Sequence, residues 1–195
     1  MAGTATALRE SSQMYLDSMY AEPVLELSIL GFLAEGPLHG YELRRKVAQL
    51  SGYTRPVSDG SLYPAIARLV RDGFLDRHAE KGKAAAQRNV LSLTDAGRAE
   101  LQGRLREPAQ VELTDLTRFL VVLAFLHLLP EAGERDAVLR RRLEFLEQPA
   151  SFFYDGDVPL RRSDMTDPYR EGLFVIAKAA STAERRWLGQ MLDHQ

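Results

Sequence analysis

Residues 58–75 read Ser58-Asp-Gly-Ser-Leu-Tyr-Pro-Ala-Ile-Ala-Arg-Leu-Val-Arg-Asp-Gly-Phe-Leu75, and this stretch decides the fold. Its apolar residues fall on one face of a short amphipathic helix: Leu62, Ile66, Leu69 and Val70. The opposite face carries Tyr63, Arg68 and Arg71. Proline is tolerated in the first helical turn, where backbone N–H groups lack intrahelical partners, so Pro64 predicts a start near Gly60 or Ser61. The candidate N-caps are Ser58, Asp59 and Ser61.

The same stretch ends in a way that suggests a particular motif. Asp72-Gly73 stops the helix, and Phe74-Leu75 begins an extended segment. A short helix that leads through a glycine into a strand suggests the third helix of a winged helix-turn-helix. Before it, residues 24–34 are apolar on nearly every side, which predicts a buried helix. Residues 35–40 form a turn bracketed by glycine and proline, and residues 41–50 form a second amphipathic helix.

Two strands and a further helix are predicted after residue 73. Residues 74–79 and 88–93 are strand candidates, and the second alternates apolar and polar side chains. Together they form a two-stranded wing. Thr94 caps another helix that runs to about residue 106. The sequence therefore predicts a mostly α-helical protein: an N-terminal winged helix-turn-helix of three helices and a two-stranded wing, followed by an α-helical dimerisation domain.

Several motifs in this region also resemble a known family. Residues 27–43 read Leu-x-Ile-Leu-Gly-Phe-Leu-Ala-Glu-Gly-Pro-Leu-His-Gly-Tyr-Glu-Leu. They are followed, in order, by Ser58-x-Gly60-x-Leu62-Tyr63-Pro64, Arg68-Leu69, Gly73 and Leu93-Thr94-x-x-Gly97. Over residues 24–101 this resembles the PadR family of bacterial transcriptional regulators. The family usually has Tyr two residues before the Leu-Thr pair, where this chain has Leu91. The resemblance implies a repressor that a small, often phenolic or drug-like molecule releases.

The predicted DNA-binding residues come from the helix starts and from the wing. Helix N-termini offer free N–H groups to phosphates, and basic wing residues reach the backbone or minor groove. The candidates are His39, Gly40, Tyr41, Ser58, Gly60, Ser61, Tyr63, Arg68, Lys81, Lys83 and Arg88. A structural interpretation stays open for Tyr41 and Tyr63, whose rings could pack with their hydroxyls in water. The expected partner is a palindromic operator in double-stranded DNA, read by a homodimer at two half-sites.

Beyond residue 106 the pattern is helical. Residues 111–129 form one helix with an apolar seam that ends at Pro130, and residues 135–147 and 169–192 form two more. The last helix carries the predicted dimerisation residues Leu173, Ile176, Ala180, Trp187 and Met191. A long loop, 149–168, contains an aromatic cluster. The candidate contacts for a small aromatic effector are Phe119, Phe152, Tyr154 and Trp187, with an interface role as the alternative for Trp187.

These patterns divide the chain into three parts. Residues 1–21 form an N-terminal arm or an extra helix, and residues 22–106 form the DNA-binding domain with its closing helix. Residues 107–195 form the dimerisation and candidate effector-binding domain. Net charge is −2, but residues 22–106 carry 13 Lys and Arg against 10 Asp and Glu. This mild basic excess gives weak support to nucleic-acid contact there, and random scatter around neutrality is the alternative.

Other classes of protein find little support. The chain has no cysteine, no phosphate loop or dinucleotide fingerprint, and no recognisable Ser-His-Asp arrangement, so we expect no enzyme and no cofactor. The four histidines are scattered, which argues against a metal site. The longest apolar run, 119–129, is too short to span a membrane, and we expect a cytoplasmic protein. The alternative function is a winged-helix module that binds proteins and not DNA.

Overall fold

The computed structural model describes residues 22–50, 58–80, 88–148 and 151–193. The chain divides into two compact units, Met1–Pro130 and Glu131–Gln195. The described elements of the first unit are α2 (Glu22–Glu35), β1 (Leu38–His39), α3 (Gly40–Leu50), α4 (Asp59–Arg71), β2 (Leu75–Glu80), β3 (Arg88–Leu93), α5 (Asp95–Arg106), α6 (Gln110–Thr114), α7 (Leu116–Phe125) and η1 (Leu126–Leu128). Those of the second unit are α8 (Ala132–Glu147), β4 (Tyr154–Asp155), β5 (Val158–Pro159), η2 (Arg162–Asp164) and α9 (Pro168–Asp193).

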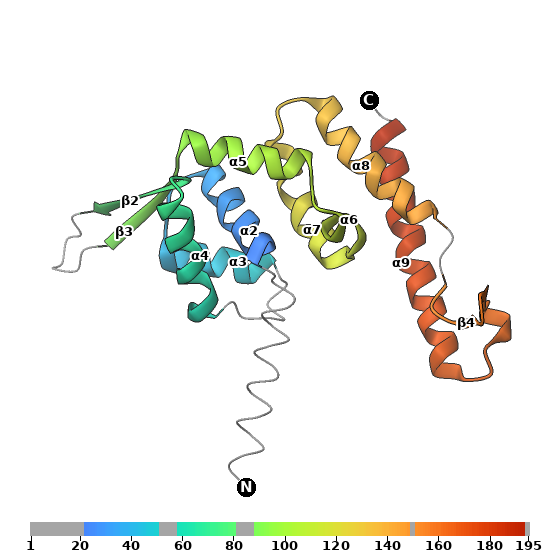
Figure 1. Cartoon of the computed structure of the whole chain (residues 1–195). Helices are drawn as coiled ribbons and strands as arrows, with labels where there is room; N and C mark the ends of the chain where they lie inside the picture. Colours follow the sequence, from blue (N-terminus) through green and yellow to red (C-terminus); the bar gives the residue numbers. More distant parts are fainter. Residues whose placement is uncertain (1–21, 51–57, 81–87, 149–150, 194–195) are drawn as a thin grey trace, which may run out of the picture. The chain divides into compact units, whose positions relative to one another are not determined.

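Helix α2 is the centre of the first unit. It contacts α3, α4, α5, α7 and β3, which surround it in Figure 1. Its apolar side chains are buried all round the helix: Val24, Leu25, Leu27, Ile29, Leu30 and Leu33. A helix can bury every side only inside a core, so the prediction of a buried helix at 24–34 is confirmed.

Helix α4 has the amphipathic character that the sequence predicts. Leu62, Ala65, Ile66 and Leu69 are buried, whereas Tyr63 and Pro64 are exposed. Ser58 is the N-cap, and its side chain accepts a hydrogen bond from the backbone N–H of Ser61 at 3.2 Å. The helix begins at Asp59, slightly earlier than predicted, so Pro64 lies in the second turn and not in the first. At the other end Gly73 has φ +77°, a left-handed conformation that favours glycine.

The wing belongs to a sheet with one strand more than predicted. Strands β2 and β3 pair antiparallel in the register Leu75↔Leu93 to Glu80↔Arg88. The short strand β1 pairs with the other edge of β3, giving the order β1-β3-β2. The sequence placed Leu38 and His39 in a turn, because two residues are too few to show a strand's alternation. Their backbone pairing with Leu91 and Val90 makes them a strand.

The region after α5 differs from the prediction in two ways. The single helix expected over 111–129 is broken at Asp115, which has an extended backbone and caps α7 by accepting from the N–H of Arg118 at 2.9 Å. The boundary between units also differs from the one expected at 106/107, since α6 and α7 belong to the first unit. Helix α7 contacts α2, and its Phe119, Val122 and Phe125 are buried.

The second unit is a pair of packed helices with a small hairpin. Helices α8 and α9 are in contact, and a bidentate ion pair joins Arg142 to Glu184 at 2.7 and 2.9 Å. The predicted 149–168 loop contains the hairpin β4–β5 and the turn η2 in its described part. Phe152 and Phe153 contact the ring of Phe174 on α9 with centroids 5.7 and 5.8 Å apart. None of the described helices combines the length and apolarity that crossing a membrane requires.

Candidate nucleic-acid interface

The N-terminal end of α4 presents one group of predicted residues. Gly60 is exposed, and the ring of Tyr63 is 47% exposed. The hydroxyls of Ser58 and Ser61 are hydrogen-bonded to each other at 2.8 Å, so both take part in capping the helix. Asp59, the acidic residue of this end, forms an ion pair with Arg44 of α3 at 3.2 Å. The two serines cap the helix, and their contact with DNA stays a prediction. Tyr63 is the exposed aromatic side chain of this end.

The N-terminus of α3 carries a second group. The carboxylate of Glu42 accepts the backbone N–H of His39 at 2.9 Å, which holds the first turn in place. This bond, together with one from the hydroxyl of Tyr41 at 3.3 Å, lowers the pKa of the Glu42 carboxyl. The rings of His39 and Tyr41 stack with an interplanar angle of 11° and centroids 5.8 Å apart. Tyr41 is 59% exposed, so its ring presents aromatic surface next to the helix end.

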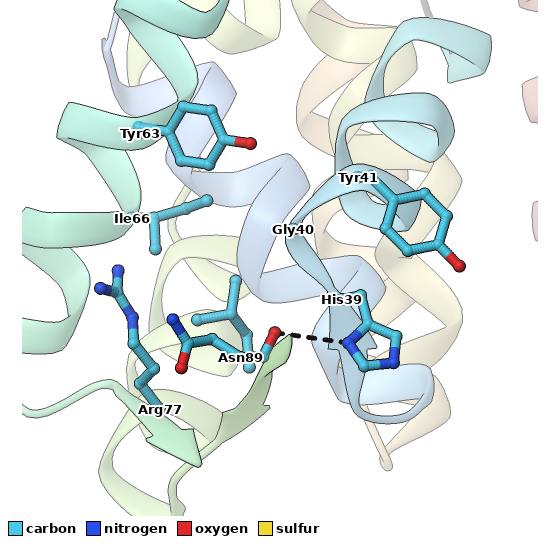
Figure 2. Close-up of a pocket in the computed structure, with 8 residues that line it drawn as sticks. His39, Gly40, Tyr41, Tyr63, Ile66, Arg77 and Asn89 are labelled. Carbon is cyan, nitrogen blue, oxygen red and sulfur yellow. Dashed lines mark hydrogen bonds between the residues drawn. The ribbon is translucent and has the colours of Figure 1, made fainter. Parts of the chain in front are cut away.

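The two helix ends meet the sheet at a hollow of about 360 Å³. Figure 2 shows Tyr63 on α4, the His39–Tyr41 segment beside it, and Arg77 and Asn89 extending from the strands. The residues that line the hollow are His39, Gly40, Tyr41, Tyr63, Ile66, Arg77, Asn89 and Leu91. The Nδ1 of His39 lies 3.4 Å from the backbone carbonyl of Asn89 and donates to it, since a carbonyl can only accept. Four predicted residues, His39, Gly40, Tyr41 and Tyr63, thus come together here.

Sequence reasoning missed Arg77 and Asn89. Leu75 and Leu91 are buried residues of β2 and β3, and side chains two apart on a strand share a face. Arg77 and Asn89 therefore lie on the same face as the buried leucines, one step nearer the wing tip. The alternation in each strand could have pointed to them, but their nearness to each other depends on the register, which pairs Arg77 with Leu91.

Arg68 has a different environment from the one predicted. Its Nε donates to Glu26 of α2 at 3.1 Å, and Arg104 of α5 donates to the other oxygen of Glu26, also at 3.1 Å. Burial works to lower the pKa of Arg104, but hydrogen bonds to Glu100 and Glu26 outweigh it and the pKa is raised. Glu26 thus ties α4 and α5 to α2. The ion pair gives Arg68 a structural role, and a DNA contact by Arg68 stays a prediction.

Three of the predicted DNA contacts lie wholly or partly outside the described residues. Lys81 and Lys83 lie outside the described residues, as does the side chain of Arg88, although its backbone belongs to β3. Residues 1–21, the predicted arm or extra helix, also lie outside them.

The predicted dimerisation residues lie on one stripe of α9. Exposed fractions are 41% for Leu173, 72% for Ile176, 39% for Trp187 and 38% for Met191, and Ala180 is also exposed. With Tyr169 and Ala183 they repeat every three or four residues along the helix.

The effector candidates are dispersed. Phe119 is buried in the first unit at 1% exposure, so it is a core residue and we drop it from the ligand hypothesis. Phe152 and Tyr154 are 56% and 55% exposed in the second unit. Within the described ranges no group of three or more His, Asp or Glu side chains could hold a metal ion.

Comparison with known proteins identifies the N-terminal region. The family model "Transcriptional regulator PadR-like family" matches residues 29–103. A 37.1 kDa protein of transposon TN4556 from Streptomyces fradiae is 36% identical over 90 residues, which cover 43% of this chain and 26% of that protein. The negative transcriptional regulator PadR of Bacillus subtilis is 24% identical over 133 residues, covering 66% of this chain and 73% of that protein.

Among solved structures, one match is the crystal structure of B. subtilis PadR in complex with operator DNA. It covers 88% of this chain and 98% of that chain, at 20% identity and a TM-score of 0.43. The family match falls on the elements from α2 to α5, which form the winged helix-turn-helix described above. Residues 29–103 therefore match the PadR-like family of transcriptional regulators, and this domain is what the chain shares with the PadR regulator of B. subtilis.

Proposed function

We propose that this regulator binds double-stranded DNA with α4 in the major groove. The observation that carries the proposal is the division of α4 into two faces. Leu62, Ala65, Ile66 and Leu69 fix the helix to the domain, whereas Tyr63 and its neighbours at the N-terminal end are exposed. A recognition helix needs this division, because it must stay rigid while its outer side chains reach base edges and phosphates.

Three features of the same face support the proposal. The α3 N-terminus adds backbone N–H groups suited to a phosphate. His39 and Tyr41 lie beside this helix end, and the wing strands β2 and β3 border the same hollow. Lys81 and Lys83, which lie between β2 and β3 in the sequence, and Arg88 of β3 add positive charge close by in the sequence.

We propose further that the DNA-binding form is a homodimer joined through the α9 stripe, and that it reads a palindromic operator. One winged helix covers a single half-site, and a twofold dimer reads two half-sites about one helical turn apart. The exposed apolar stripe supports the pairing, since such surfaces mark interfaces. Release by a small aromatic effector is a proposal that rests on the family resemblance, with Phe152, Tyr154 and Trp187 as its candidate contacts.

Tyr63 gives the test. Tyr63→Ala removes an exposed ring, so the melting temperature should stay within a few degrees while affinity for the DNA upstream of the protein's own gene falls about tenfold or more. Fluorescence anisotropy over a range of salt concentrations measures this. Tyr154→Ala is the matched control, because Tyr154 is a similarly exposed tyrosine of the second unit.

The salt dependence separates the two candidate functions. A DNA-binding regulator loses affinity steeply as salt is added, because phosphate contacts release counterions. If the wild-type protein binds no duplex even at low salt, the protein-interaction module becomes the better interpretation.

A further inference from the structure

The hollow between α4, the start of α3 and the wing contains polar groups that the domain does not use. Among the described residues, no hydrogen bond or ion pair engages the guanidinium of Arg77, the side-chain amide of Asn89 or the hydroxyl of Tyr63. Other arginines of the same unit are paired: Arg44 with Asp59, Arg68 with Glu26 and Arg71 with Asp72. Arg77 therefore keeps its charge and its donors for a partner from outside.

The charge around the hollow favours an anion. Arg77 is a cation in its lining, and no Asp or Glu is among the described residues that line it. The nearby carboxylate of Glu42 is turned to the His39 backbone N–H and to the Tyr41 hydroxyl. Asn89 can donate two N–H bonds and Tyr63 one O–H bond. Arginine and neutral donors gathered in one place match a phosphate group, which offers only acceptors.

The hollow is bordered by apolar side chains and by the backbone at the start of α3. Ile66 and Leu91 line the hollow with apolar surface, and Figure 2 shows Arg77 extending from the strand side toward Ile66. At Gly40 an added Cβ would lie 3.6 Å from the ring of Tyr63. The hollow thus borders the backbone at the N-terminus of α3 and the exposed Tyr63 of α4.

We propose that this hollow seats one phosphodiester group of the DNA backbone, with Arg77 as its ion-pair partner and Asn89 and Tyr63 as hydrogen-bond donors. The proposal rests on the DNA-binding function and adds a fixed contact between the sheet and the backbone strand that passes beside α4. Such a contact sets how deeply α4 enters the groove, and it reads no base.

The test uses the full-length protein, the upstream duplex and a duplex of the same length with scrambled sequence. Arg77→Ala should weaken binding to both duplexes by about tenfold and reduce the slope of log affinity against log salt by about one. Asn89→Asp should weaken both as well, since it puts a carboxylate beside the phosphate at almost unchanged size. Arg98→Ala is the control, because Arg98 is an exposed arginine of α5 outside the hollow. Melting temperatures should stay close to wild type, because Arg77 and Asn89 are exposed.

A second measurement locates the phosphate. Phosphates of the upstream duplex are replaced one at a time by uncharged methylphosphonates, and one replacement should weaken the wild type but not Arg77→Ala. If Arg77→Ala keeps wild-type affinity and salt slope while the wild type binds, the phosphate seat is wrong and the DNA-binding function stands. A loss confined to the upstream duplex would overturn it too, because that pattern indicates base reading. A wild type that binds neither duplex removes the DNA-binding function itself.

Discussion

At the scale of single residues, Glu26 shows how a charged side chain can organise a helical domain. It is buried to 15% exposure and accepts from Arg68 and Arg104, which lie 42 and 78 residues away in the sequence. Removing one partner of an ion pair that is mostly shielded from water costs more than removing one from a surface pair, because the remaining charge loses a counterion that water cannot fully replace. The sequence showed Arg68 on the outer side of its helix, but nothing local to it indicated a carboxylate on α2.

Arg68→Ala should lower the free energy of unfolding by about 1–2 kcal/mol, because it leaves Glu26 with one fewer donor. A double-mutant cycle with Glu26→Gln in urea unfolding should give a coupling free energy of about 1 kcal/mol. Well below the melting temperature, DNA affinity should change less than it does in Arg77→Ala. If the two mutations instead change the free energy of unfolding additively, and Arg68→Ala loses DNA binding, then Arg68 acts as a DNA contact.

At the scale of elements, the junction between α4, β2 and α5 depends on a close approach. An added Cβ at Gly97 would overlap the carbonyl oxygen of Phe74 and come within 2.8 Å of Leu93. That carbonyl already accepts the N–H of Thr94, and the side chain of Thr94 caps α5 by accepting from Gly97. Gly97 is the glycine of the Leu-Thr-x-x-Gly motif, and this close packing explains why the motif has glycine at that position.

Gly97→Ala should therefore destabilise the protein by about 1–3 kcal/mol or more, as overpacking does in other cores. Gly103→Ala lies in the same helix with nothing within 4 Å of its added Cβ, and it should stabilise by up to about 1 kcal/mol through helix propensity. Urea unfolding of the two variants measures both changes in the free energy of unfolding, which should have opposite signs. Equal effects would mean that propensity, and not the Phe74 carbonyl, decides at Gly97.

At the scale of the whole molecule, the feature that bears on assembly is the exposed apolar stripe of α9 in the second unit. The α9 stripe runs from Tyr169, 86% exposed, to Met191. It lies beside the face that carries Glu184 and the buried Leu188. A stripe that repeats every three or four residues over most of a 26-residue helix can pair with its twofold copy along a shared seam.

Ile176→Glu places a charge in the middle of this stripe, where pairing would bury it. We expect a monomer in light scattering and a large loss of affinity for the upstream duplex, because two linked half-sites become one. Val175→Glu is the control: Val175 is 43% exposed and lies about 100° away around the helix. A dimer that survives Ile176→Glu would move the interface elsewhere.

The sequence by itself determined the features that depend on neighbours within a few residues. It predicted the buried faces of α2 and α4, the Ser58 and Thr94 caps, the two wing strands and the family motifs, because helix and strand periodicity and capping are local. It missed the break between α6 and α7 at Asp115, because the apolar seam continues across this helix cap.

Only the tertiary structure decided which distant residues meet. In the structure β1 pairs with the sheet, and Arg68 forms an ion pair with Glu26. Phe119 is buried in the core. Arg77 and Asn89 line the same hollow as Tyr63. The physical reason is that these contacts depend on strand register and on how helices pack. A strand shows in sequence which side chains share a face, but not which side chains of another strand or helix will lie next to them.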